Sequence, residues 1–529
     1  YAQPPVDDMA LDEWRAWVTD QLHPLVQQHQ PEHVATVTAL TAELRDSRKR
    51  PVAVQQAQAL LHWAELAQME AWPQARLANT QLLFDHLCAT NFDFVQLQHL
   101  RGLFRAQTEL ALAYHGLFGN GDLRRLEPDA AAPLIHVNAE LMAKCATDFR
   151  LAQQAVQQRQ RLDYGNGQRW LTWEGHMLYL ADLMAYACLE PLKAAGLLSA
   201  DTAVVTYFQQ QTEIRLIPYY NIVLIGLPSW VQNLYDRPSS AFLVIPHEVG
   251  HALYRFGPVP RPAQPKVYAA LAEGLAALQI PADDWRAGWV EELFADAFGC
   301  LIAGPISVLG MQEYLATGVP AHFSAPGQDH PTAAMRPLIQ SEILRILDER
   351  GVASYKTIPD LLDQHWQIFL ANNGGTELRA HAVETVDFPL PGANAQVPGR
   401  TMLDQLRPTL SVIVDLLLEL FPAATSSAQW SPWSTDLSVA SATVAESIAA
   451  LQAQFQDFYC RDGRLQRPLS PPPVADHYQP SPLHTQIGEI AERIQHNQPP
   501  TTIPKTEWHQ LFLIDGWTDE GGKAGHIPQ

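Results

Sequence analysis

The spacing of apolar residues predicts that the first third of the chain is helical. Between Asp8 and about Lys193, stretches such as 52–69 and 103–117 are rich in Ala, Leu and Gln and carry apolar residues at helical intervals, with Pro, Gly and Asn between them. These stretches show no convincing repeat of fixed length. We therefore expect a helical N-terminal lobe over residues 1–195.

Runs of β-branched and aromatic residues interrupt this pattern near Ile214. Residues 214–227 and 241–245 are rich in such side chains, which favour strands. Prolines, which favour the ends of strands, bound the two runs at Pro218, Pro228 and Pro238. The pattern predicts a small sheet within a central segment, residues 196–350.

The remaining chain is expected to form a second helical lobe and a tail. Helical patterning resumes at Pro246 and continues, with Pro-rich and Gly-rich interruptions, to about Tyr459. We therefore expect a helical C-terminal lobe over residues 351–460. From Arg461 onward prolines are frequent, which favours an extended Pro-rich tail over residues 461–529.

The composition argues against two kinds of partner. The 529 residues carry a formal net charge of −21, whereas a nucleic-acid binder needs a basic surface. The most apolar stretch, 410–421, contains Asp415 and Glu419 and is shorter than the ~20 apolar residues of a membrane span. We expect neither a nucleic acid nor a membrane as a partner.

The cysteines favour a cytoplasmic location. The five cysteines are odd in number, widely spaced and without a CxxC pair, which fits reduced thiols better than a disulfide framework. No charged leader with an apolar segment opens the chain, although a chain that begins at Tyr1 leaves secretion open.

The most informative segment, residues 246–254, has the sequence PHEVGHALY and contains an HExxH motif. It follows an expected strand and is expected to be helical. Because residues four apart share one face of a helix, His247 and His251 can offer imidazole nitrogens to one Zn²⁺, with Glu248 beside them. A catalytic zinc site needs a third protein ligand, which must come from elsewhere in the chain.

A second motif supplies candidates for that ligand. Residues 289–299 have the sequence WVEELFADAFG, in which Glu292 and Asp296 lie one helical turn apart. This spacing offers one carboxylate as a metal ligand and a second that can accept an imidazole N–H. Glu291 is the alternative ligand, but Ala295 stands four residues after it, so the pattern favours Glu292.

HEVGH followed by EELFADAFG resembles the gluzincin group of zinc metallopeptidases, in which the HExxH and ExxxD helices pack together. The resemblance implies a mainly α fold (α+β), with a zincin-like metallopeptidase core and a small sheet embedded in a large helical body. It implies three zinc ligands, His247, His251 and Glu292. It further implies that Glu248 is the general base and that Asp296 orients a zinc-binding histidine.

A third element, residues 329–336 (DHPTAAMR), resembles the HPxxxxR signature of the CAAX prenyl peptidase and heat-shock peptidase group. That resemblance implies that His330 and Arg336 stabilise the oxyanion of the reaction. The same residues also fit an ordinary helix start, with Asp329 as the N-cap, Pro331 at the first helical position and Arg336 in a surface ion pair.

The expected function is therefore zinc-dependent hydrolysis of a protein or peptide substrate. A peptide is expected to lie along an edge strand, either 241–245 or 220–227, and Tyr219 or Tyr220 is a possible further oxyanion donor. The sequence is also compatible with a latent enzyme, in which a lobe or the Pro-rich tail covers the cleft. The alternative is a catalytically silent zincin-like scaffold that binds protein partners through its helical lobes. Segments typical of serine hydrolases, dinucleotide binders and phosphate-binding loops are absent from the sequence.

Overall fold

The computed structural model describes residues between 11 and 61 and between 151 and 459, with gaps that include 218–221, 230–241, 260–265, 326–329 and 425–442. The chain divides into two compact units, the first comprising 1–93, 100–149 and 479–529, and the second comprising 94–99 and 150–478. The predicted Pro-rich tail and both candidate tyrosines, Tyr219 and Tyr220, lie outside the described residues.

The described part of the first unit is helical, as the sequence predicts. Its elements are α1 (Leu11–Trp17), the π-helical turn η1 (Val18–Leu22), α2 (His23–His29), the 3₁₀ turn η2 (Pro31–His33) and α3 (Val34–Glu43). Trp14 and Trp17 pack edge to face, with ring centroids 5.6 Å apart, and both are buried in the small core of this unit. Apolar contacts therefore hold these short helices together.

The second unit contains a three-stranded sheet. Its strands are β3 (Ala203–Gln209), β4 (Glu213–Ile217) and β5 (Ile222–Pro228), in the spatial order β3-β5-β4, with β5 parallel to β3 and antiparallel to β4. Strands β4 and β5 confirm the predicted strand region in its described residues, 214–217 and 222–227, whereas β3 was not predicted. A short hairpin of β1 (Arg161–Asp163) and β2 (Arg169–Leu171) also lies where helix was expected.

The expected peptide-binding edges are wrong. Residues 222–226 of β5 pair with both neighbouring strands, so β5 offers no free edge there. The described residues of the segment 241–245 do not form a strand, because helix α9 (Val244–Phe256) begins there. Pro246 lies in the first turn of α9, where a backbone N–H has no partner within the helix, so this proline is compatible with the helix. Val244 and Ile245 are buried as residues of this helix.

Helices make up most of the described residues of the second unit. Helix α8 (Trp173–Ala194) is capped by Thr172, whose side chain accepts a hydrogen bond from the Gly175 amide, and packs against β3 and α9. The later elements are α10 (Val267–Ala277), α11 (Trp285–Gly288), α12 (Val290–Ala303), α13 (Pro305–Leu315), α14 (Arg336–Glu349), α15 (Ile358–Asn373), α16 (Thr376–Ala380), the 3₁₀ turn η7 (Val383–Thr385), the hairpin β6 (Asp387–Pro389) and β7 (Gln396–Pro398), α17 (Gly399–Leu420) and α19 (Val444–Tyr459).

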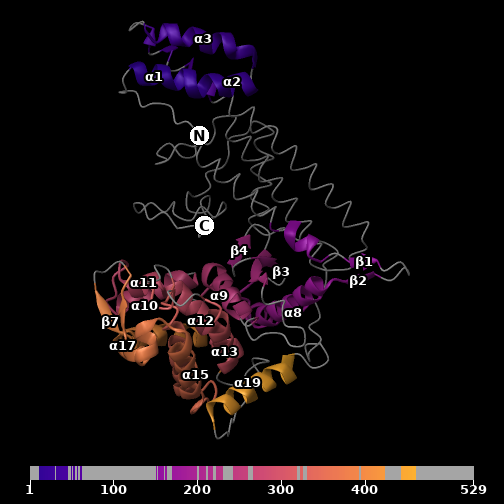
Figure 1. The fold of residues 1–529 in the computed structure, drawn as a ribbon, viewed down its shortest axis with the longest axis vertical. Coiled ribbons are helices and arrows are strands. Elements are labelled where there is room, and N and C mark those ends of the chain that lie inside the picture. The colour runs from indigo at the N-terminus through magenta and orange to yellow at the C-terminus, as the bar shows by residue number, and fades with distance from the viewer. Residues whose placement is uncertain are drawn as a thin grey trace. The chain divides into compact units, whose positions relative to one another are not determined.

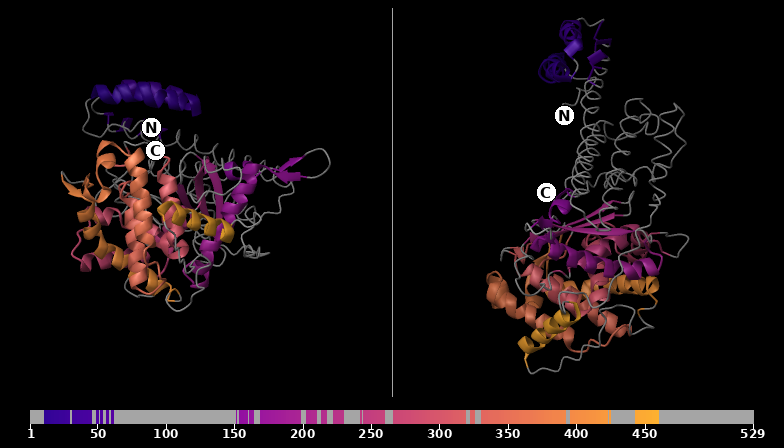
Figure 2. Two further views of the ribbon diagram at one scale, coloured as in Figure 1. Left: turned by 60° about the horizontal axis from the view of Figure 1, so that its bottom comes forward. Right: turned by 90° about the vertical axis from the view of Figure 1, so that its right-hand side faces the viewer.

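Helices α9 and α12 make the most extensive contact among the described helices of this unit and lie in its core (Figure 1). A Cβ atom on Gly250 would come within 2.8 Å of the Cα atom of Ala295, so the glycine permits this close approach. Helix α12 also packs against α13, α14 and α17 and is buried on almost all sides, as its apolar sequence requires. The views in Figure 2 show the sheet at one edge of the helices α9 to α17.

The structure is thus mostly helical with a small sheet, in agreement with the expected secondary-structure class. Among the described residues, no helix combines the length and the apolar character that crossing a membrane requires.

Candidate metal centre

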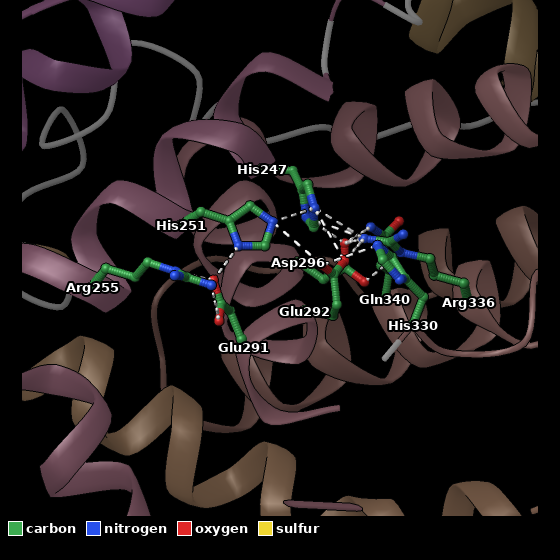
Figure 3. Close-up of polar contacts among 9 residues, drawn as sticks. All are labelled: His247, His251, Arg255, Glu291, Glu292, Asp296, His330, Arg336 and Gln340. Carbon is green, nitrogen blue, oxygen red and sulfur yellow. Dashed lines mark hydrogen bonds and ion pairs between the residues drawn. The ribbon is translucent and has the colours of Figure 1, made fainter. Parts of the chain in front are cut away.

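Three buried side chains from α9 and α12 bring their ligand atoms to one point (Figure 3). The Nε2 atoms of His247 and His251 lie 3.2 Å apart. The carboxylate of Glu292 places Oε2 3.4 Å from the first of these atoms and Oε1 3.5 Å from the second. Atoms that bind a tetrahedral zinc ion at about 2.0 Å are about 3.3 Å from one another, so the arrangement fits such an ion.

The imidazole of His247 is oriented by a buried carboxylate. Its Nδ1 atom lies 2.9 Å from Oδ1 of Asp296, which is completely buried. Gln340 of α14 donates a 2.8 Å hydrogen bond from Nε2 to the same oxygen. When His247 is neutral and Asp296 accepts its Nδ1–H, the lone pair of Nε2 points toward the ligand cluster, which is the tautomer that metal binding needs.

The imidazole of His251 has a carboxylate partner of its own, Glu291. The distance from His251 Nδ1 to Glu291 Oε1 is 3.1 Å. Arg255, one turn further along α9, donates to both oxygens of Glu291, at 2.8 and 3.1 Å. Glu291 thus lies behind a histidine, while Glu292 faces the convergence point, as the sequence pattern favours.

Arg336, the first residue of α14, connects the two buried carboxylates of α12. Its Nε and Nη2 atoms donate to the two oxygens of Asp296 at 2.9 and 3.0 Å, and Nη2 also donates to Glu292 Oε2 at 2.9 Å. The same Nη2 lies 3.1 Å from His247 Nε2. Arg336 is 7% exposed, so the alternative of a surface ion pair is wrong.

The buried charges of the centre match a divalent cation. Glu248, Glu292 and Asp296 supply three negative charges when ionised, and Arg336 supplies one positive charge. Metal binding requires both histidines to be neutral, and in that state these groups have a net charge of −2 in a region from which water is largely excluded. Such charges are costly unless they are paired, and an ion of charge +2 bound at the three ligand atoms would balance them.

The pKa values follow from this crowding. Burial and the guanidinium of Arg336 oppose protonation of His247, but the carboxylates of Asp296 and Glu292 outweigh them and raise its pKa to about 9. Burial favours the neutral form of Glu292, yet His251, His247 and Arg336 lower the pKa of Glu292 well below its usual range. The ligand carboxylate is therefore ionised at neutral pH, as metal binding requires.

Glu248 differs from the ligand carboxylate in its pKa. Its side chain is buried beside His247, His251 and Glu292, and burial is the main cause that raises its pKa. A carboxylate with a raised pKa is a better proton acceptor than an ordinary one, so the site has one carboxylate suited to binding a metal and another suited to general base chemistry.

His330 reaches the same cluster from the segment that precedes α14. Its Nε2 atom lies 3.3 Å from Glu292 Oε1, and its side chain is 59% exposed. The segment does not form the expected ordinary helix start, because α14 begins only at Arg336. Thr332 O accepts hydrogen bonds from the amides of Met335 and Arg336, and Trp366 donates from Nε1 to Ala334 O. These contacts place a turn between His330 and Arg336.

The structure thus brings together seven residues that the sequence singled out, all of the candidates except the tyrosines outside the described residues: His247, Glu248, His251, Glu292, Asp296, His330 and Arg336. It adds three residues that sequence reasoning missed or placed differently: Glu291, Arg255 and Gln340. The signal for Arg255 was its position one helical turn after His251.

Comparisons with protein-family models, with curated proteins and with solved structures gave no match. The structure itself defines the class of site. It is a buried His-His-Glu group that could hold a metal ion, on a mostly helical fold.

Proposed function

We propose that this protein is a zinc-dependent hydrolase that cleaves peptide bonds in a protein or peptide substrate. The observation that carries the proposal is the convergence of His247, His251 and Glu292 at the separations of a tetrahedral zinc site. These ligands leave a fourth position, as catalytic zinc sites do. The bound ion would polarise the scissile carbonyl and make a water molecule more acidic.

Glu248 would act as the general base in this reaction. It follows the first ligand on α9, and its buried carboxylate has a raised pKa. It would accept a proton from the attacking water and deliver it to the nitrogen of the leaving amine as the C–N bond breaks. The products would be a carboxylic acid and an amine, with no other reactant than water.

His330 and Arg336 would have different parts. Nε and Nη2 of Arg336 already bind Asp296 and Glu292, so we assign this residue the positioning of those carboxylates. His330 lies at the ligand cluster with a largely exposed side chain, which suits a donor to the substrate carbonyl. This division narrows the expectation from the HPxxxxR resemblance, in which both residues stabilise the oxyanion.

Metal analysis of three variants tests the proposal. Wild-type protein and Glu248→Gln are expected to contain about one zinc per chain, and His251→Ala is expected to lose it. Wild type is expected to release fluorescent fragments from labelled casein or a mixed peptide library, whereas Glu248→Gln is not. A wild type that takes up no zinc contradicts the metal site, and one that binds zinc but cleaves no peptide favours the scaffold alternative.

A further inference from the structure

We propose that Glu291 and Arg255 form a positioning pair that sets the orientation of His251 and thereby the affinity of the site for zinc. The inference rests on the proposed function, because it concerns the same metal centre. It assigns a role to two residues that supply no ligand atom to the His-His-Glu group.

The contacts form a chain of two links between α9 and α12. His251 Nδ1 and Glu291 Oε1 are 3.1 Å apart, and His251 Nε2 faces the cluster, 3.5 Å from Glu292 Oε1. Donation from Nδ1–H to Glu291 fixes the tautomer that leaves the lone pair on Nε2. Two hydrogen bonds from Arg255 to the two oxygens of Glu291 then fix the carboxylate in one rotamer.

The two histidines are held in different ways. The carboxylate behind His247, Asp296, is fully buried and is also bound by Arg336 and Gln340. The carboxylate behind His251 lies nearer the surface, with 26% of its side chain exposed, and Arg255 has 36% exposed. Arg255 therefore holds Glu291 near the surface, as the buried residues Arg336 and Gln340 hold Asp296.

An alternative is that the Glu291–Arg255 ion pair only joins two helices. A partly exposed ion pair between helices contributes little to stability, and α9 and α12 are already held by an extensive apolar contact. A pair that only joins the helices should leave zinc affinity unchanged. A pair that orients His251 should change zinc affinity with little effect on the zinc-free fold.

The test measures zinc dissociation constants by competition with a chromophoric chelator, and melting temperatures of the zinc-free proteins. Glu291→Gln is expected to bind zinc about tenfold more weakly than wild type. Arg255→Met is expected to show a smaller loss, and the double variant is expected to bind no more weakly than Glu291→Gln alone, since Arg255 acts through Glu291. The matched control is Glu273→Gln, since Glu273 is an exposed residue of α10. Its zinc dissociation constant and melting temperature should equal those of wild type.

The outcomes separate this inference from the proposed function. Wild type that binds no zinc contradicts the metal site itself. If wild type binds zinc and the zinc dissociation constant of Glu291→Gln is within twofold of the wild-type value, the positioning pair is overturned but the metal site is not. The positioning role is also overturned if the losses in the two single variants add in the double variant, or if the zinc-free melting temperature of Glu291→Gln falls several degrees below that of Glu273→Gln. If Glu291→Gln does not fold, an unchanged zinc affinity in Arg255→Met overturns the pair.

Discussion

Arg336 donates two hydrogen bonds to the carboxylate of Asp296, one from Nε and one from Nη2. Substitution of Arg336 by Met would leave Asp296 and Glu292 buried without this cation. Breaking a buried ion pair from one side costs about 3–5 kcal/mol, so we expect a fall of that size in the free energy of unfolding of the zinc-free protein, measured in urea. Zinc is expected to restore part of the loss.

The matched control for Arg336→Met is Arg350→Met. Arg350 also binds a carboxylate with two hydrogen bonds, but its partner Asp415 is 54% exposed. Exposed ion pairs contribute about 0–1 kcal/mol to stability, so the free energy of unfolding of this variant should be close to that of wild type. Equal effects of the two substitutions would contradict the buried network described for Arg336.

Zinc binding is expected to release a proton from His247. At pH 7.5 this imidazole carries a proton in the zinc-free protein, because its pKa is about 9, and a metal ligand must be neutral. Calorimetric titration with zinc in buffers of different ionisation enthalpy should therefore report release of about one proton, with apparent affinity rising between pH 7 and pH 9. Affinity that is constant across this range would rule out a protonated His247.

The same pKa predicts how the stability of the zinc-free protein depends on pH. The pKa of His247 is higher in the folded protein than its ordinary value of 6.5, so protonation stabilises the fold. This contribution is fully present below about pH 6.5 and is lost as the pH rises through about 9. Urea unfolding from pH 6.5 to pH 9 should show the decline, and the variant His247→Gln should lack it.

Gly250 is expected to control the spacing of α9 and α12. The Cβ atom of Gly250→Ala would clash with the backbone of Ala295, which cannot move without displacing α12. Overpacking of this kind costs about 1–3 kcal/mol, and the shift should also weaken zinc binding because the ligands come from both helices. Gly375→Ala is the control, since no atom lies within 4 Å of its added Cβ, and it should have nearly wild-type stability and affinity.

His330→Ala is expected to separate turnover from metal binding. The side chain is 59% exposed and is not part of the ligand triad, so the zinc dissociation constant and melting temperature should stay close to those of wild type. Loss of an oxyanion donor costs about 10²–10³-fold in the rate of hydrolysis. A variant that cleaves peptides at the wild-type rate would remove His330 from the proposed mechanism.

The arrangement of the ligands was accessible from sequence because helices impose a fixed period. Four-residue spacing placed His247 and His251 on one face of α9, and the Asp296 carboxylate one turn after Glu292 indicated which glutamate faces the cluster. The contact between Glu291 and His251 could not be predicted from spacing. It depends on how α9 and α12 are rotated against each other, which is a property of packing rather than of spacing.

The errors in the predicted strands have a common physical origin. Buried helices and buried strands both use runs of apolar β-branched residues, and periodicity does not distinguish short runs. Val244 and Ile245 therefore resembled the end of a strand, although they form the first turn of α9. Strand β3 was missed despite its β-branched sequence, because it is buried along nearly its whole length and lacks the alternation of a half-exposed strand.

The site joins residues 247 and 292 across the centre of the second unit, so a bound ion would act as a removable cross-link between two core helices. Ligands that bind only the folded form add stability, about 2.7 kcal/mol at a concentration 100 times the dissociation constant. Unfolded chains are the substrates of quality-control proteases. In a cell short of zinc, this chain is therefore expected to have a shorter lifetime, so that metal supply would govern its abundance as well as its chemistry.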